Sequence, residues 1–308
     1  MNRPSRGYLL AVHEVADLPL PGSGRTLERF EALAAIARRD PVLARLAEGH
    51  ADAVAIRAEL DDPAPARPGE RWGVWAAQPR SVTAQRDGES WTLTGDRPWC
   101  SGAGSCTHAL VTASAPDGVR LFAVENRGPW ATPLDGTWPA VGMAGSDSRT
   151  VRFTDAPARP VGGPGSYVGR PGFWHGGIGV AACWYGGATG IADTLLSRAE
   201  GPHALAHLGA VDVLLSSARA VLREAAARID AEPAADAQRL AVRVRCTVES
   251  AASQVIDRVG RALGAGPLGH DGAHARRVSD LTVYLRQSHA EADLAHLGEL
   301  LKEDPPAW

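Results

Sequence analysis

The sequence has few of the residues that mark disulfide-rich or zinc-binding proteins. It contains 4 cysteines in 308 residues, Cys100, Cys106, Cys183 and Cys246, without any CxxC spacing. This pattern predicts buried thiols rather than a disulfide framework or a zinc site. Lysine occurs once, at Lys302. With arginine and alanine used freely, this bias indicates a GC-rich genome rather than a function.

Neither the charge nor the apolar runs point to nucleic acid or a membrane. The chain has 32 basic and 35 acidic residues and a formal net charge of -3, with no block of like charge that would follow phosphates. Nucleic acid is therefore not an expected partner. The apolar run near the N-terminus is too short and too soon interrupted for a signal peptide or a membrane span. We expect a cytoplasmic protein without a membrane partner.

The chain is long enough to bury a sizeable core, and its first segment, residues 1–70, has helical spacing. Apolar residues recur at this spacing on both sides of Asp40-Pro41. Because proline interrupts a helix, the pattern predicts two helices over residues 25–60. The stretch 61–70 is rich in proline and is interpreted as a connector.

The second segment, residues 71–165, consists of short alternating runs separated by turns. Asp87-Gly88 and Asp117-Gly118 each lie between two such runs and favour hairpin turns. Residues 148–158 have the pattern of a further strand. The regular spacing predicts a small β-sandwich or barrel.

The third segment, residues 166–308, returns to long alanine-rich helical patterns. These predict an antiparallel four-helix bundle, and the whole chain is therefore predicted to have an α+β fold. Gly186, Gly187 and Gly190 lie close together on the first of these helices. We interpret them as sites of tight helix packing rather than ligand contacts.

Several common sites are not predicted. The glycine strings do not follow a strand in the manner of a nicotinamide-binding unit, and no GxSxG elbow is present. His270, Asp271 and His274 are of metal-binding types, but no further ligand is suitably spaced. We interpret this stretch as a solvated loop and predict no metal.

Four stretches taken in order resemble the acyl-CoA dehydrogenase family. They are WGVWAAQP at 72–79, GESWTLTGDRPWCSGAGSCTHALVTA at 88–113, VGMAGSDSRTVRFTDAPA at 141–158 and GVAACWYGGATGIAD at 179–193. The second resembles the family pattern Gly-x-x-Leu-x-Gly-x-Lys-x-Trp-x-Ser/Thr. The resemblance implies a short N-terminal helical region, a central β domain and a C-terminal four-helix bundle.

The resemblance also implies FAD as the cofactor. Trp99 would lie along the isoalloxazine ring, and Ser101 would offer its hydroxyl and backbone N–H to the polar edge of that ring. Trp75, Ala76 and Gln78 would form the adjoining wall. A broad apolar ring with a few polar atoms needs such surroundings. The alternative for Trp99 is a core tryptophan that closes the β domain.

The sequence departs from the family pattern in the parts that hold the FAD. The N-terminal helical region is shorter, and the Thr-Glu-Pro-x-x-Gly-Ser-Asp loop is reduced to AAQPRSVT. The Arg-x-x-Phe-Gly motif lacks both its arginine and its phenylalanine. The late Gly-Gly-x-Gly-Tyr turn keeps Gly264 and Gly266 but loses its tyrosine.

Both places where family members carry the catalytic glutamate lack a carboxylate. They align with Gly176-Gly177 and with Gln287-Ser288. His175 precedes the first pair and His289 follows the second. Because an imidazole has a pKa near neutrality, its neutral form can accept an α-proton and its protonated form can donate a proton to oxygen activated at the flavin. The alternative for His289 is a residue in the first turn of a helix capped by Ser288.

The resemblance implies a flavin-dependent oxidoreductase that acts on an acyl thioester, bound to CoA or to a carrier protein. Two alternatives remain open at this point. One is a flavin-dependent monooxygenase of the same fold that uses His289. The other is a non-catalytic binding or partner subunit. The resemblance further implies a homodimer or homotetramer formed through the final helices.

Overall fold

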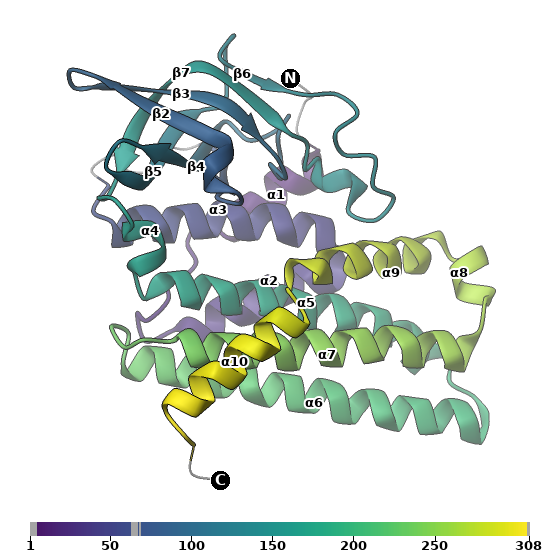
Figure 1. Ribbon diagram of the computed structural model, residues 1–308. Coiled ribbons are helices and arrows are strands. Elements are labelled where there is room, and N and C mark those ends of the chain that lie inside the picture. The colour runs from purple at the N-terminus through teal and green to yellow at the C-terminus, as the bar shows by residue number, and fades with distance from the viewer. Residues whose placement is uncertain (1–4, 63–66, 68, 307–308) are drawn as a thin grey trace. The chain divides into compact units, whose positions relative to one another are not determined.

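The computed structural model describes residues 5–62, 67 and 69–306 (Figure 1). These residues form two compact units. The barrel unit comprises the described residues up to Leu18, Arg45–Ala140 and Ala144–Phe173. The helical unit comprises Pro19–Ala44, Val141–Met143 and the described residues from Trp174 onward. The three-part division at residues 70 and 165 stays a prediction, and residues 63–66 and 68 of the expected connector lie outside the described residues.

The barrel unit is built on one sheet whose strands are β1 (Trp72–Trp75), β2 (Val82–Asp87), β3 (Ser90–Arg97), β4 (His108–Ala115), β5 (Gly118–Glu125), β6 (Ala131–Pro133) and β7 (Val151–Val161). The order β4-β2-β3-β7-β5 closes on itself because β5 also pairs with β4. β1 extends the sheet alongside β4, and β6 pairs with β7. The predicted hairpins are confirmed, with β2 paired to β3 and β4 to β5. The predicted small barrel is therefore present.

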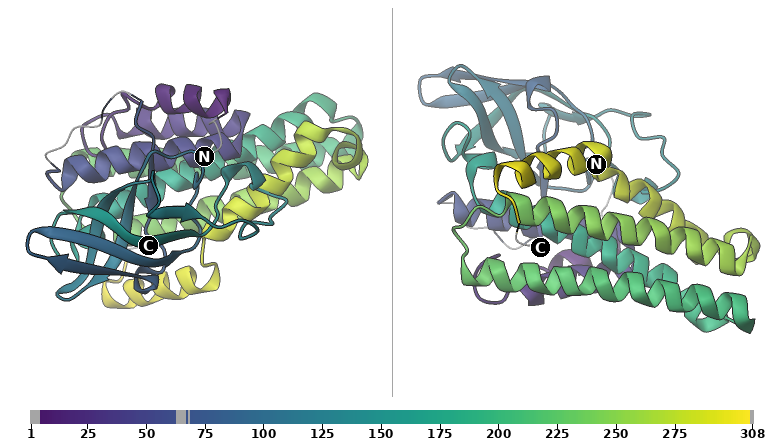
Figure 2. Two further views of the ribbon diagram at one scale, coloured as in Figure 1. Left: turned by 90° about the horizontal axis from the view of Figure 1, so that it is seen from above. Right: turned by 60° about the horizontal axis from the view of Figure 1, so that its bottom comes forward.

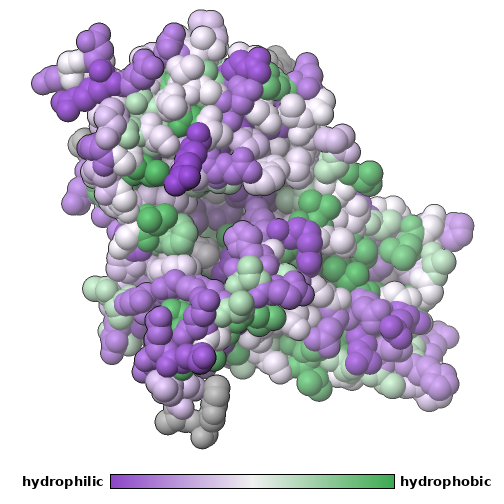
Figure 3. All heavy atoms as spheres, in the orientation of Figure 1, coloured by the Kyte–Doolittle hydropathy of each residue, from purple (hydrophilic) through white to green (hydrophobic). Residues whose placement is uncertain are grey.

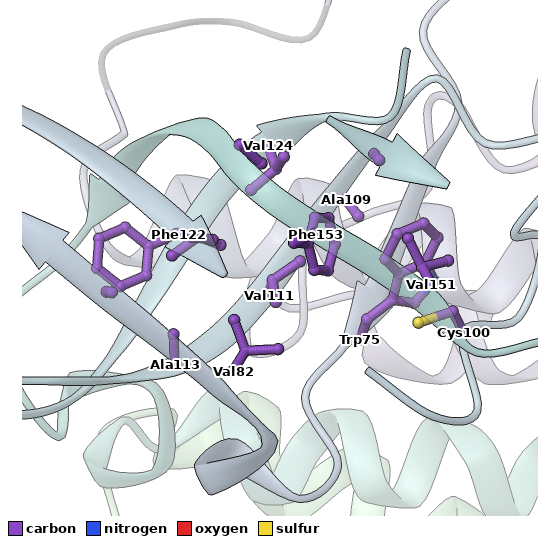
Figure 4. Packing of buried hydrophobic residues seen from close by; sticks show 14 of the residues in the cluster. Trp75, Val82, Cys100, Ala109, Val111, Ala113, Phe122, Val124, Val151 and Phe153 are labelled. Carbon is purple, nitrogen blue, oxygen red and sulfur yellow. The ribbon is translucent and has the colours of Figure 1, made fainter. Parts of the chain in front are cut away.

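The interior of the barrel is filled by side chains that alternate inward along these strands (Figure 4). Trp75 and Phe153 have ring centroids 6.4 Å apart, and Trp91 and Phe122 have centroids 5.3 Å apart. Cys100 and Cys106 belong to this cluster and are about 0–1% exposed. The core cysteines are free thiols, as the sequence predicts.

Several short helices complete the barrel unit: α1 (Arg6–Glu14), most of α3 (Pro41–Glu59), η1 (Pro79–Ser81), η2 (Ala144–Ser146) and α4 (Ser166–Gly169). Helix α1 is not expected from the sequence. The Ser5 hydroxyl caps it by accepting a hydrogen bond from the backbone N–H of Tyr8 at 3.1 Å. The Tyr8 side chain is 1% exposed and its hydroxyl lies 3.5 Å from the Cys106 sulfur. A single buried aromatic residue thus fastens a helix whose sequence pattern is weak.

The helical unit contains α2 (Thr26–Arg39), α5 (Gly172–Arg198, from Trp174 onward), α6 (Gly201–Ala231), α7 (Gln238–Leu263), α8 (Gly266–His270), α9 (Gly272–Tyr284), η3 (Leu285–Gln287) and α10 (Glu291–Glu303). The predicted break at Asp40-Pro41 is confirmed, since α2 ends at Arg39 and α3 begins at Pro41. Helices α6 and α7 lie side by side, as the right-hand view of Figure 2 shows. The long C-terminal helices are therefore those predicted from the sequence.

The glycines of α5 pack against the backbone of α2. A Cβ on Gly186 would lie 2.1 Å from the carbonyl oxygen of Ala34, and one on Gly190 would lie 2.4 Å from that of Arg38. Such distances leave no room for a side chain. The interpretation of these glycines as packing sites is confirmed.

Helix α6 keeps much of its apolar surface in solvent. Among the described residues it is the one helix that is long and apolar enough to cross a membrane, by length and composition alone. Only 17% of its most apolar stretch is buried, and Leu205 and Val213 are 55% and 65% exposed. On the face of the molecule drawn in Figure 3, apolar residues are interspersed among hydrophilic ones.

Candidate functional site

Trp99 stands out in the barrel unit as an exposed aromatic ring on strained backbone. It follows the end of β3, its side chain is 56% exposed, and its backbone φ is 59°. A bulky residue rarely adopts a positive φ, and such strain persists where the surrounding structure imposes it. The exposure excludes the alternative that Trp99 is a core residue. An open indole face is what a planar ring would stack on.

Trp75 is the core tryptophan instead. It ends β1, is 2% exposed, and lies among the buried residues of the barrel (Figure 4). Its Nε1–H donates a hydrogen bond to the carbonyl oxygen of Ser101 at 3.0 Å. Trp75 therefore supports the turn after β3 from inside, whereas the resemblance implies an exposed wall.

Ser101 is buried, and both of its hydrogen-bonding groups have protein partners. Its hydroxyl lies 2.9 Å from the Ser148 hydroxyl, which lies 2.8 Å from that of Ser146. Its backbone N–H donates to the carbonyl oxygen of Trp99 at 3.1 Å. The three serines link the turn after β3 to the segment before β7. The role of Ser101 at the polar edge of a flavin stays a prediction.

The small residues after Ser101 let the chain turn closely against that same segment. Gly102 has a φ of 74° and donates its N–H to the carbonyl oxygen of Ser146 at 2.7 Å. The N–H of Gly104 donates to the Asp147 carboxylate at 2.8 Å. A Cβ on Gly104 would lie 2.9 Å from that carboxylate. Glycine is thus favoured at position 102 by the positive φ and at position 104 by the nearby Asp147 carboxylate.

The loop between β1 and η1 forms a second exposed part of the candidate site, where Ala77 and Gln78 are exposed and Gln78 has a φ of 50°. The fully buried Arg97 holds this loop by donating to the carbonyl oxygens of Ala77 and Gln78, and it also donates to that of Thr112 on β4. Burial lowers the pKa of Arg97 to about 10, so the guanidinium remains charged at neutral pH. The sequence reasoning missed Arg97, although it occupies the lysine position of the quoted family pattern.

A cavity of about 370 Å³ opens beside this loop. It is lined by Ala76, Ala77, Pro79, Thr112, Val119, Gly165, Tyr167, Val168 and Phe173. The rings of Tyr167 and Phe173 meet edge to face with centroids 5.5 Å apart. Burial raises the pKa of Tyr167 to about 12, so its hydroxyl is neutral at physiological pH. None of the lining residues is charged, and no sequence motif had indicated Tyr167 or Phe173.

His289 belongs to the helical unit, where Asp293 orients it. The backbone N–H of His289 donates to one Asp293 oxygen at 3.0 Å, and its Nδ1 lies 3.2 Å from the other. The His289 side chain is 78% exposed. The Ser288 hydroxyl accepts a hydrogen bond from the N–H of Ala290 at the start of α10. These contacts are those of a residue at the start of α10. They use Nδ1 of His289 and not Nε2. The catalytic role of His289 stays a prediction.

His175 lies near the start of α5 and is 3% exposed. The two positions aligned with a family carboxylate lie close together in the helical unit, because Arg245 joins them. Its guanidinium donates to the carbonyl oxygens of Gly177 at 2.9 Å and of Gln287 at 3.1 Å, and it stacks over the Trp184 ring at 4.7 Å. A cation therefore stands at this junction.

Gly264 and Gly266 also lie in the helical unit, at the junction of α7 and α8. Gly264 ends α7 with a φ of 65°, which glycine adopts without strain. No described atom lies within 4 Å of where a Cβ on either glycine would be, leaving their surroundings open. Their predicted part in holding a cofactor is not tested by this geometry.

No protein-family model matches the sequence, and no curated protein matches it. Solved structures do match it in fold. TdsC from Paenibacillus sp. A11-2 with FMN and indole has 20% identity and a TM-score of 0.79, over 97% of this chain and 88% of that one. Methanesulfinate monooxygenase MsuC from Pseudomonas fluorescens has 18% identity and a TM-score of 0.75, over 92% and 84%. XiaF from Streptomyces sp. with FADH2 and glycerol has 18% identity and a TM-score of 0.74, over 91% and 82%.

TdsC is described as a dibenzothiophene monooxygenase, so these similar structures are flavin-bound enzymes or monooxygenases. At such low identity the likeness concerns the fold. The predicted α+β architecture with a small barrel and a C-terminal helical region is confirmed. The chain thus has the acyl-CoA-dehydrogenase-like fold that flavin-dependent monooxygenases share.

Proposed function

We propose that the chain is a flavin-dependent monooxygenase, which uses reduced flavin and O2 to oxygenate an organic substrate and releases water. The observation that carries the proposal is the exposed indole of Trp99, held on strained backbone two residues after Arg97, whose guanidinium binds the exposed Ala77-Gln78 loop. When bound, the flavin would supply the two electrons and the site of O2 activation. The fold shared with TdsC, MsuC and XiaF supports this proposal.

The barrel unit fits the isoalloxazine ring that FMN and FAD have in common. Trp99 offers an exposed aromatic ring, and the Ala77-Gln78 loop is exposed as well. Arg97 holds the loop, and the serine chain holds the turn that follows Trp99. The choice between FAD, which the resemblance implies, and FMN is left to the binding measurement below.

The cavity beside the loop favours an apolar or aromatic substrate. Its lining residues are apolar apart from Thr112 and Tyr167, and the Thr112 hydroxyl already donates to the carbonyl oxygen of Ala76 at 3.0 Å. The phosphates of a CoA ester would find no cation among the lining residues. We propose that this cavity takes the apolar part of the substrate.

The dehydrogenation of an acyl thioester is the competing function. That reaction needs a carboxylate to remove the α-proton. The two positions aligned with this carboxylate are Gly176-Gly177 and Gln287-Ser288. The Arg245 guanidinium donates hydrogen bonds to the carbonyl oxygens of Gly177 and Gln287. An oxygenase needs no such carboxylate, and His289 is the proposed proton donor. This difference favours the oxygenase.

The first test measures binding of FMN and FAD to the purified chain by flavin fluorescence and calorimetry. The anaerobic reduced complex is then mixed with 18O2 and with indole or dibenzothiophene, and the products are analysed by mass spectrometry. We expect a product that has gained one 18O atom. Reoxidation without labelled product from either probe would leave the flavin site standing and contradict the apolar substrate.

Two other outcomes would overturn the proposal. Anaerobic bleaching of bound flavin by an acyl thioester would establish the dehydrogenase. Failure of the folded chain to bind either flavin, oxidised or reduced, would establish the non-catalytic alternative. Thermal unfolding in the same buffer confirms that the chain is folded in each case.

We propose in addition that a second copy of the chain covers α6. The exposed Leu205, Ala206, Gly209 and Val213 fall along one side of this helix, and burial of such a surface stabilises an assembly. Light scattering should then give a dimer or tetramer. Replacing Leu205 and Val213 with glutamate should give a folded monomer. A monomeric wild-type chain, or one that partitions into detergent micelles, would contradict this assembly.

A further inference from the structure

Arg97 is a buried cation whose hydrogen bonds all go to carbonyl groups. Its side chain is 0% exposed. The acceptors are the carbonyl oxygens of Ala77, Gln78 and Thr112, and the Gln78 distance is 2.6 Å. Its Nε has no hydrogen-bond partner among the described residues. Three backbone segments that are far apart in sequence thus meet at one guanidinium.

No carboxylate neutralises this charge within the part of the chain that the structure describes. The other buried arginines of the barrel unit, Arg57 and Arg170, pair with Asp62 at 2.5 Å and with Glu59 at 2.6 Å. Burial of an unpaired charge is costly, and buried charges are normally paired. Arg97 is therefore an exception to the pairing of buried charges, and we ask what its charge does at this position.

The acceptors of Arg97 place its charge behind the walls of the candidate site. Ala77 and Thr112 line the cavity, and Gln78 forms the exposed loop with its left-handed backbone. Trp99 follows Arg97 by two residues. The guanidinium consequently ties the Ala77-Gln78 loop to β4, and its positive charge lies in a region of low dielectric where its field is weakly screened.

Reduced and oxidised flavin differ in how they respond to such a charge. Reduced flavin readily loses the proton on N1 and then carries a negative charge over N1 and the C2 carbonyl, whereas oxidised flavin is neutral. A fixed positive charge near this end of the ring favours the anion, and charge near N1 is one of the ways a protein tunes a flavin. An oxygenase that takes up reduced flavin benefits from such a preference.

We propose that Arg97 is a positioning residue that fastens the Ala77-Gln78 loop to β4, and that its charge makes the site bind reduced flavin more tightly than oxidised flavin. This inference rests on the proposed flavin site. It concerns the selection of one redox form, which neither the motif nor the fold assigns.

The test compares dissociation constants of reduced and oxidised FMN and FAD, measured anaerobically, for wild type, Arg97→Lys and Arg97→Gln. We expect wild type to prefer the reduced form by about tenfold or more, which corresponds to at least about 1.4 kcal/mol. Arg97→Lys should keep most of the preference because the charge remains, and Arg97→Gln should lose it. Arg152→Gln is the matched control, because Arg152 pairs with Asp96 at the surface and is 55% exposed.

A merely structural role for Arg97 would weaken binding of both redox forms equally, and an unchanged ratio in Arg97→Gln overturns the electrostatic part. Equal affinity of wild type for the two forms overturns it even where Arg97→Gln fails to fold. Hydrogen exchange at the Ser81 N–H, which donates to the Gln78 carbonyl oxygen at 3.0 Å, tests the positioning part without flavin. Faster exchange in Arg97→Lys is expected, and unchanged exchange overturns it. Absence of all flavin binding overturns the proposed function, which is a different result from binding without a redox preference.

Discussion

The indole Nε1 of Trp75 donates a hydrogen bond to the carbonyl oxygen of Ser101 at 3.0 Å inside the barrel core. This bond joins the end of β1 to the turn that follows β3. The buried tryptophan thereby holds the backbone two residues after the exposed one. Trp75 thus supports the turn from the core, and Trp99 is the ring that is exposed for contact with a ligand.

Replacing Trp75 with phenylalanine should remove this bond and leave a void. We expect the free energy of unfolding to fall by about 2–4 kcal/mol, since a buried carbonyl loses its donor and the core loses packing. Urea denaturation measures the loss. Trp91→Phe, a loss of indole from the same core cluster, leaves the Ser101 contact in place. If both variants bind flavin equally well, Trp75 has no special part in the site.

Replacing Trp99 with alanine should weaken flavin binding with little effect on stability. The indole is 56% exposed, so its removal opens no cavity. Loss of a stacked aromatic contact of about 0.5–1.5 kcal/mol corresponds to a roughly 2- to 12-fold weaker affinity. Fluorescence titration measures the affinity, and Trp99→Phe should restore most of it. Unchanged affinity in the alanine variant would count against this placement of the ring.

Stability should decrease as the pH falls from about 6.5 towards 4, in part because of His50. This residue is 5% exposed, its Nδ1 accepts a hydrogen bond from the N–H of Trp72, and burial lowers its pKa from 6.5 to about 4. The unfolded chain then binds the proton first, so the contribution is fully present above pH 6.5 and is lost as the pH falls through the folded value. The upper bound is about 3 kcal/mol.

The control for this pH dependence is His50→Gln, which keeps an acceptor for Trp72 and does not titrate. Chemical denaturation from pH 4 to 7.5 should give a smaller slope for the variant than for wild type. A residual slope is expected, because burial also lowers the pKa of His108 in the same direction. Identical slopes in the two proteins would show that His50 is not responsible.

Replacing Gly186 with alanine should disrupt the contact between α5 and α2. The new Cβ would lie 2.1 Å from the Ala34 carbonyl oxygen, so the helices must separate. We expect a loss of about 1–3 kcal/mol or more from overpacking. Gly260→Ala on α7 is the matched control, because no described atom lies within 4 Å of its Cβ position, and it should stabilise the chain by about 0.5–1 kcal/mol. Thermal unfolding distinguishes the opposite signs.

Replacing Asp293 with alanine should release the His289 ring. The carboxylate holds both the backbone N–H and Nδ1 of His289, so wild type should show the tautomer protonated on Nδ1. The 15N shifts of the imidazole report that tautomer, and Asp293→Asn should preserve it in part because the amide oxygen still accepts. Glu299→Gln, next to His296, should not alter the His289 signal. A tautomer mixture that is the same in all four proteins would contradict this orientation.

Much of the fold was predictable because its signals are local. The Asp87-Gly88 turn, the break at Asp40-Pro41 and the glycines of α5 each impose a conformation on their immediate neighbours. Helix α1 was missed because its buried aromatic residue, Tyr8, contacts Cys106 about a hundred residues away. Local pattern carries no information on such a contact.

The candidate site was predictable in part, through the motif around Trp99. Burial decided the rest: Trp75 and Trp99 look alike in the sequence, yet one fills the core and the other faces solvent. Asp293 and Arg97 were missed because a carboxylate or a guanidinium has no distinctive spacing until its partners are known.

The sequence by itself determined where the long helices and the two hairpins run, since turn residues and apolar periodicity act within a few positions along the chain. Only the tertiary structure decided which tryptophan is exposed, how Arg97 joins three segments, and that an apolar cavity opens beside its loop. Those features depend on the closure of the barrel, which brings residues from β1, β3 and β4 to one place.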